Sequence, residues 1–361
     1  MVEGRRKKMT KVLMKGNEAI AEAAIQAGCQ AFFGYPITPQ SEIPEYFARE
    51  MPKHDRLFLQ SESEMAAMNM CMGASASGAR VMTSTSGPGY CLKLEALAAM
   101  TLNRLPAVVT IVMRNGPAFG TMKASQEDYR MNGNGGYKIV LLAPSDVQEA
   151  AEMSFEAFDI ADKYRNPVVI LADGMIGQMM GSVDFDKMPP KRKDLPEKDW
   201  ALHGKKYRGG KPVLHLPPMG TEHFKTKHWQ ETELYPDIIK NETKVEITDV
   251  KDADIVLVAY GTAARMCKAA VIDEQPGSVL KIGIIRPKTL WPYPYKAFEE
   301  IGSNCKAVIC AEMNIVGQMI DDVRIASSGR WPVYHVGDSE NDFLMPQDIV
   351  DKVHKVWEEV K

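Results

Sequence analysis

Three short stretches decide the fold of this chain: Tyr35-Pro36-Ile37-Thr38-Pro39, Glu64-Met65-Ala66-Ala67 and Thr85-Ser86-Gly87-Pro88-Gly89. The first ends a short apolar run that has the length of a buried strand, and its prolines stop that strand. The second opens a helix rich in small residues, and the third is a turn between a strand and a helix. Open α/β sheets place their ligands at the carboxyl ends of the strands, so the first stretch is expected at such an end.

Short apolar runs alternate with helical periodicity through the first half of the chain. This alternation is typical of a parallel sheet that is covered by helices on both faces. We expect strands at residues 31–35, 57–60, 79–85, 107–113, 139–143 and 167–172, and helices at 17–29, 63–77, 92–102 and 147–161.

The composition changes between about residue 185 and residue 245, where Pro, Lys, Gly and His accumulate. A segment of roughly 60 residues exceeds an ordinary connection, so we expect an excursion that lies on a neighbouring domain or subunit. A second, smaller α/β unit follows, with strands expected at 255–259, 281–285, 307–311 and 333–335 and a terminal amphipathic helix from 347. The predicted division is therefore 1–185, 186–245 and 246–361.

The composition excludes several classes of protein. Hydrophobic residues make up 45% of the 361 and charged residues 25%, which is the balance of a soluble enzyme. The net charge of -3 gives no reason to expect nucleic acid as a partner. No apolar run reaches the ~20 residues that span a bilayer. The six cysteines are scattered without a C-x-x-C pair, which favours a reducing, cytoplasmic location, and the basic cluster Arg5–Lys8 is expected to be a solvated tail.

In this order and spacing, the three stretches resemble the pyrimidine-binding domain of thiamine-diphosphate enzymes. The resemblance implies a glutamate against ring nitrogen N1′, where a desolvated carboxylic acid promotes the tautomer whose 4′-nitrogen acts as an internal base. Glu64 is the predicted catalytic acid, and the residues expected at the cofactor are Tyr35, Pro36, Ile37, Glu64, Gly87, Pro88 and Gly89.

Glu62 competes with Glu64 for this role. The spacing to Ala66-Ala67 and Gly73 favours Glu64, and the small residues after it let the helix approach the cofactor closely. Glu62 would then end the preceding strand, where a surface or subunit-contact role is the plainer interpretation.

A closer resemblance covers nearly the whole chain. Besides the stretches above, Gln60-Ser61-Glu62, Ala259-Tyr260-Gly261-Thr262, Arg286-Pro287 and Glu312-Met313-Asn314 are similar to the alpha-type subunit of 2-oxoacid:ferredoxin oxidoreductases, most of all the 2-oxoisovalerate branch. This resemblance implies coenzyme A-dependent oxidative decarboxylation of a 2-oxoacid, with electrons passed to ferredoxin.

The same resemblance predicts that Thr38 and Arg114 meet the substrate. A guanidinium suits a planar carboxylate through paired hydrogen bonds, although a strand-end arginine can also form a structural salt bridge. The loop Gln126–Tyr129 is expected near the site without a chemical step. Ser86–Gly89 and Ala118–Lys123 depart from the branched-chain pattern, so 2-oxoglutarate and aryl 2-oxoacids stay open as substrates.

Some parts of such an enzyme are missing from the sequence. Asp173 stands in the nearest approach to a diphosphate and metal motif, without a following asparagine pair, and is interpreted as an ordinary strand-end residue. The resemblance therefore implies a beta-type partner that holds Mg²⁺ and the diphosphate. It also implies gamma-type and ferredoxin-like delta-type subunits, with the [4Fe-4S] clusters on partner chains, because no cluster-binding cysteines are visible here.

The second unit resembles a transketolase C-terminal-type domain, for which a scaffolding role is expected. Two rival functions are a non-redox decarboxylase split between chains and a non-catalytic assembly subunit. The first leaves the second unit and the Tyr35–Pro39 stretch unexplained. Retention of Glu64, Thr38 and Arg114 together argues against the second.

Overall fold

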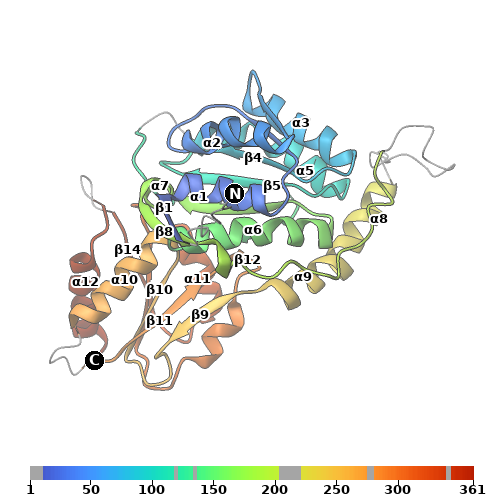
Figure 1. Ribbon diagram of the computed structural model, residues 1–361. Helices are drawn as coiled ribbons and strands as arrows, with labels where there is room; N and C mark the ends of the chain where they lie inside the picture. The colour runs from blue at the N-terminus through green and yellow to red at the C-terminus, as the bar shows by residue number, and fades with distance from the viewer. Residues whose placement is uncertain (1–10, 118–120, 133–135, 203–220, 275–279, 339–342) are drawn as a thin grey trace.

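A seven-stranded sheet organises the first part of the chain (Figure 1). The computed structural model describes residues 11–117, 121–132, 136–202, 221–274, 280–338 and 343–361, so the basic cluster at residues 5–8 lies outside the described residues. The strand order is β12-β6-β7-β5-β4-β2-β3, and every neighbouring pair is parallel except β12 with β6. The strands are β2 (Ala31–Gly34), β3 (Leu57–Gln60), β4 (Val81–Thr85), β5 (Val108–Met113), β6 (Val140–Leu142), β7 (Val168–Asp173) and β12 (Thr289–Trp291).

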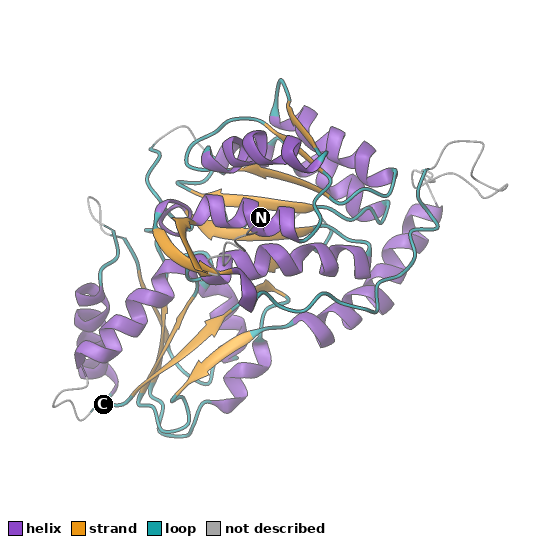
Figure 2. Cartoon of the chain, in the orientation of Figure 1, coloured by secondary structure: helices purple, strands orange, loops and turns teal. Residues whose placement is uncertain are grey.

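Helices cover both faces of this sheet, as Figure 2 shows. On one face lie α1 (Gly16–Gln26), α2 (Glu42–Glu50) and α6 (Val147–Tyr164); on the other lie α3 (Glu64–Ala76) and α5 (Leu94–Leu102). The strand alternation is visible in β2, where Phe32 packs with the α1 side and Phe33 with the α3 side. The predicted α/β class with a parallel sheet is confirmed.

A five-stranded sheet organises the second part, in the order β14-β13-β10-β11-β9. Its strands are β9 (Val245–Thr248), β10 (Ile255–Ala259), β11 (Ile282–Pro287), β13 (Ala307–Ala311) and β14 (Val333–Val336), and only β9 runs antiparallel to its neighbour. The core on one face includes α10 (Gly261–Glu274) and α12 (Pro346–Val360). The core on the other face includes α11 (Ile320–Ser327) and the 3₁₀ helix Tyr295–Glu300, and it is continuous with the α3 side of the first sheet.

Two strand pairings join segments that are far apart in the sequence. In the sequence, β12 lies between β11 and β13, which both belong to the second sheet. It nevertheless pairs antiparallel with β6 and forms the edge strand of the first sheet. β1 (Lys11–Lys15) pairs antiparallel with β8 (Met180–Asp184), just after the short helix α7 (Gly174–Gln178). Their side-chain pattern alone did not predict these strands, because their pairing partners lie about 150 residues away or more.

The segment after β8 contains the 3₁₀ helix Phe185–Lys187, α8 (Thr221–Trp229), a π-helical stretch Gln230–Leu234 and α9 (Tyr235–Glu242). Its described part lies on the seven-stranded unit of this same chain. Ile238 is fully buried in the α1 and α6 core, and the Gln230 amide donates to the Thr101 carbonyl at 2.9 Å. Arg192 donates to both carboxylate oxygens of Glu242. These bonds hold the loop around Arg192 against α9.

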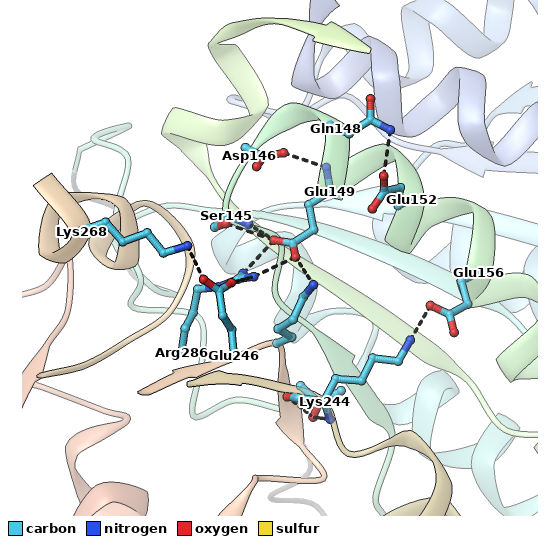
Figure 3. A network of polar contacts seen from close by, with 12 residues as sticks. Ser145, Asp146, Gln148, Glu149, Glu152, Glu156, Lys244, Glu246, Lys268 and Arg286 are labelled. Carbon is cyan, nitrogen blue, oxygen red and sulfur yellow. Dashed lines mark hydrogen bonds and ion pairs between the residues drawn. The ribbon is translucent and has the colours of Figure 1, made fainter. Parts of the chain in front are cut away.

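A polar cluster joins the two sheets at the start of α6, and Figure 3 shows it from close by. Arg286 on β11 donates to both oxygens of Glu149 on α6, at 2.7 and 2.9 Å, and also to Glu246 on β9. Arg286 is 3% exposed and Glu149 7%, so this is a buried ion pair between the two units. Burial alone would raise the pKa of Glu149, but the hydrogen bonds from Arg286 and Lys288 hold that pKa at about 2.

Candidate active site

The predicted site residues follow four adjacent parallel strands, β5, β4, β2 and β3. Thr38 comes after β2, Glu64 after β3, the Thr85–Gly89 turn after β4 and Arg114 after β5. Because parallel strands have their carboxyl ends on one edge, the fold brings these segments together at that edge. Within the turn, the residues Gly87–Cys91 form a short helix, α4, which was predicted only as a turn.

Glu64 is the first residue of α3 and is 6% exposed, whereas Glu62 is exposed. The side chain of Ser63 caps the helix by accepting a hydrogen bond from the Ala66 amide at 3.2 Å. The Glu64 carboxylate lies directly against the turn, since a Cβ added at Gly89 would come within 2.5 Å of Glu64 Oε1 and would also meet Thr85 Oγ1. Only a glycine leaves this space open.

Two buried hydroxyl groups of the turn lack partners. Thr85 Oγ1 and Ser86 Oγ are shielded from solvent and make no hydrogen bond within the part of the chain that the structure describes. Buried polar atoms are normally satisfied, so such groups beside a buried carboxylate fit a polar ligand. The residues present thus fit the edge of an aminopyrimidine ring, which offers nitrogen donors and acceptors.

Arg114 connects the turn to the Tyr35–Pro39 loop. Its guanidinium donates from Nη1 to the Thr38 carbonyl oxygen at 2.9 Å, and it is 9% exposed. Gly87 has φ +39°, and a Cβ there would lie 3.1 Å from Arg114 Nε. The Thr38 side chain is exposed, so its hydroxyl stays accessible beside the arginine.

The loop that carries Thr38 is held by hydrogen bonds from side chains. Gln40 is fully buried, accepts a hydrogen bond from Ser84 of β4 and donates to the Tyr35 carbonyl at 3.1 Å. Asn17 and Gln178 both donate to the Pro39 carbonyl at 2.8 Å. Of the other predicted cofactor residues in this loop, Pro36 is exposed and Ile37 is half-buried.

Two buried charged residues in the site were missed as participants. Lys93 is fully buried, and its ammonium donates to the Glu64 carbonyl at 3.1 Å and to Thr83 Oγ1 at 3.0 Å; burial lowers the pKa of Lys93 to about 8. Asp128 is fully buried, and burial raises its pKa to about 7. A lone lysine inside the apolar run of residues 92–102 was the available signal for the first. The loop containing Asp128 was expected near the site, but without a role.

Asp173 ends β7, as the sequence indicated, and its contacts are structural. Its carboxylate caps α7 by accepting from the Ile176 amide at 3.1 Å. It also accepts from the amide and the hydroxyl of Thr262, at 2.7 Å each, at the start of α10. No group of three or more potential metal-ligating side chains occurs in the described ranges.

Comparisons with known proteins agree on one family. Residues 22–246 match the family described as "Pyruvate flavodoxin/ferredoxin oxidoreductase, thiamine diP-bdg", and residues 253–349 match "Pyruvate:ferredoxin oxidoreductase core domain II". The ketoisovalerate oxidoreductase subunit VorB of Methanothermobacter marburgensis is 38% identical over 96% of this chain and 98% of that protein. The 2-oxoglutarate synthase subunit KorA of Methanocaldococcus jannaschii is 35% identical over 86% of this chain and 90% of its own length.

The chain belongs to the 2-oxoacid:ferredoxin oxidoreductase family.

A solved member of the 2-oxoacid:ferredoxin oxidoreductase family has the same fold. The 2-oxoglutarate:ferredoxin oxidoreductase from Magnetococcus marinus, solved with 2-oxoglutarate, coenzyme A and succinyl-CoA bound, superposes with a TM-score of 0.83 at 25% identity. The match covers 96% of this chain and 65% of that one. A split-gene transketolase, at 17% identity and a TM-score of 0.60, shares the fold alone.

Membership in this family makes the chain an alpha-type subunit of a thiamine-diphosphate-dependent oxidoreductase, so the family resemblance predicted from the sequence is confirmed. The curated relatives are named as subunits, which means that such enzymes work as multi-subunit complexes. In the part of the chain that the structure describes, every helix is too short or too polar to cross a bilayer.

Proposed function

We propose that this chain supplies the aminopyrimidine half of a 2-oxoacid:ferredoxin oxidoreductase site, with Glu64 as the catalytic residue. When bound, thiamine diphosphate supplies the nucleophilic carbon that lets a 2-oxoacid lose CO₂. The observation that carries the proposal is the buried Glu64 carboxylate against Gly89, close to the buried Thr85 hydroxyl, which has no partner in the described residues. The Glu64 carboxyl would hold a proton at ring nitrogen N1′.

The substrate roles belong to Arg114 and Thr38. The guanidinium at the end of β5 would bind the 2-oxoacid carboxylate, and the exposed Thr38 hydroxyl would donate to an oxygen of the same molecule. Tyr35, Pro36, Ile37, Gly87, Pro88 and Gly89 would also contact the cofactor. The two glycines let the turn approach the Arg114 and Glu64 side chains closely.

The overall reaction is oxidative decarboxylation of a 2-oxoacid with coenzyme A to acyl-CoA, CO₂ and reduced ferredoxin. We favour a branched-chain substrate of the 2-oxoisovalerate type, because the relatives at 38% identity carry that name whereas the 2-oxoglutarate relatives are at 30 to 35%. A panel of 2-oxoacids with coenzyme A and a low-potential dye tests this choice. Equal rates on 2-oxoglutarate and 2-oxoisovalerate would reject it.

The remaining parts of the enzyme are assigned to partner chains. A beta-type subunit would hold the diphosphate and Mg²⁺, and gamma-type and ferredoxin-like delta-type subunits would complete the complex and carry [4Fe-4S] clusters. Five of the six free cysteines of this chain are buried, which suits reduced thiols in the cytoplasm.

The decisive experiment is Glu64→Gln in the assembled complex. We expect turnover to fall by about 100-fold or more, because the amide cannot hold the proton at N1′, with assembly and the ultraviolet-visible spectrum unchanged. Glu62→Gln is the matched control, since the exposed Glu62 should be replaceable without loss of activity. Near-normal turnover of the Glu64 variant would reject the assignment, and a complex without iron–sulfur absorbance would favour a non-redox decarboxylase.

A further inference from the structure

We propose that Asp128 is a positioning residue for Arg114 and the Thr85–Gly89 turn, and that the second α/β unit holds Asp128 in place. The inference rests on the proposed function, because it concerns the arginine that would bind the 2-oxoacid. Asp128 belongs to the segment 125–130, which crosses from the site toward the second unit between β5 and β6. Under this inference, the second unit helps to position site residues in addition to its expected scaffolding role.

On the side of the site, one carboxylate oxygen joins two strands. Asp128 Oδ2 accepts hydrogen bonds from the Gly87 amide at 3.2 Å and from the Arg114 amide at 3.1 Å. Gly87 follows β4 and Arg114 follows β5, so this oxygen sets the distance between the turn and the arginine. Asp128 is fully buried, so water does not compete with these two hydrogen bonds.

On the other side, Gln126 fixes the segment to the second unit. Its backbone amide donates to the Met313 carbonyl at 2.8 Å, and its side-chain oxygen accepts from the Met313 amide at 2.9 Å. Its side-chain nitrogen donates to the Tyr260 carbonyl at 3.0 Å. Gln126 is fully buried, and the residues after β10 and β13 provide partners for both the oxygen and the nitrogen of its side chain.

Gln318 of the second unit forms hydrogen bonds with residues on both sides of Asp128 in the sequence. Its side-chain nitrogen donates to the Glu127 carbonyl, and its side-chain oxygen accepts from the Arg130 amide, each at 2.7 Å. The Tyr129 hydroxyl adds a bond of 2.7 Å to Asp322. The residues on each side of Asp128 are therefore hydrogen-bonded to the second unit, which restrains the position of Asp128.

The test uses Asp128→Ala, Asp128→Asn and Gln318→Leu in the assembled complex. Loss of the carboxylate should raise the KM for the 2-oxoacid about tenfold or more, with a smaller change in kcat and an unchanged KM for coenzyme A. Asp128→Asn keeps an acceptor oxygen and should restore most of the affinity. Gln318→Leu should raise the same KM although Gln318 lies outside the site, whereas the control Gln347→Leu, on the exposed face of α12, should not.

The outcomes separate this inference from the proposed function. If Glu64→Gln is inactive but Asp128→Ala and Gln318→Leu keep the wild-type KM for the 2-oxoacid, the inference is wrong and the proposed function stands. An active Glu64→Gln rejects the proposed function whatever the Asp128 variants do. If Asp128→Ala does not assemble, the KM of Gln318→Leu decides. Equal losses with both the 2-oxoacid and coenzyme A would point to general destabilisation and overturn the inference.

Discussion

At the scale of single residues, the site depends on how closely one α-carbon approaches one carboxylate. Because residue 89 is a glycine, the Glu64 side chain can contact the turn. The Lys93 ammonium donates a hydrogen bond to the Glu64 carbonyl. A side chain at residue 89 would meet Thr85 Oγ1, Glu64 Oε1 and Glu64 Cγ, all of which are side-chain atoms. A change there should therefore affect the position of the carboxylate more than the stability of the fold.

We expect Gly89→Ala to lower turnover by about tenfold to 100-fold, because the displaced carboxylate no longer lies where the ring nitrogen would be. The melting temperature of the complex should change little. Gly73→Ala in the same helix as Glu64 is the control: nothing lies within 4 Å of a Cβ there, so activity should be kept and stability should rise by about 0.5–1 kcal/mol. Wild-type turnover of Gly89→Ala would show that the contact is unimportant.

At the scale of secondary-structure elements, α6 and β11 are joined by the Glu149–Arg286 pair of Figure 3. The pair is accompanied by the Ser145 amide and by Lys288, so the remaining lone pairs of Glu149 are satisfied. Removing one partner of such a buried pair leaves an uncompensated charge, which typically costs about 3–5 kcal/mol. The ion pair therefore contributes to holding the two sheets together.

The contribution of the Glu149–Arg286 pair can be measured from the pH dependence of stability. The folded pKa of Glu149 is about 2, below the value of 4.5 for a free glutamate, so its stabilisation is fully present above pH 4.5. It is lost as the pH falls from 4.5 toward 2, to an extent of about 3 kcal/mol. Glu149→Gln should be less stable at pH 7 and should show a flatter decline of the melting temperature over this acid range. Equal slopes for the two proteins would contradict the assignment.

At the scale of the whole molecule, the chain brings the residues of the proposed half-site together along a single sheet edge. Glu64, the turn, Arg114 and Thr38 all lie there, and the second unit reaches the same edge through residues 125–130. The diphosphate and metal functions are proposed for a partner chain.

We expect thiamine diphosphate and Mg²⁺ together to leave the melting temperature of the isolated chain unchanged, because half a site gives weak binding. With the beta-type partner present, the same addition should raise it, since saturation at about 100 times Kd adds about 2.7 kcal/mol. Thermal unfolding with and without the partner measures both. A clear rise for the chain alone would mean that it binds the whole cofactor.

The sequence by itself determined the α/β class, most strands of both sheets and the placement of the motif residues at strand ends. It also favoured Glu64 over Glu62, and the structure buries the first and exposes the second. These features are local: strand and helix periodicity, capping and turn residues act within about ten residues of the chain.

Only the tertiary structure decided what joins the parts. Three contacts connect residues that are 137 to 187 positions apart in the sequence. They are the pairing of β12 with β6, the Glu149–Arg286 pair and the hydrogen bonds of Gln126 with Met313. No local pattern marks such partners, because each depends on how two sheets pack against each other. Asp128 was missed for the same reason: the amides of Gly87 and Arg114, which follow β4 and β5, meet its carboxylate only in the folded chain.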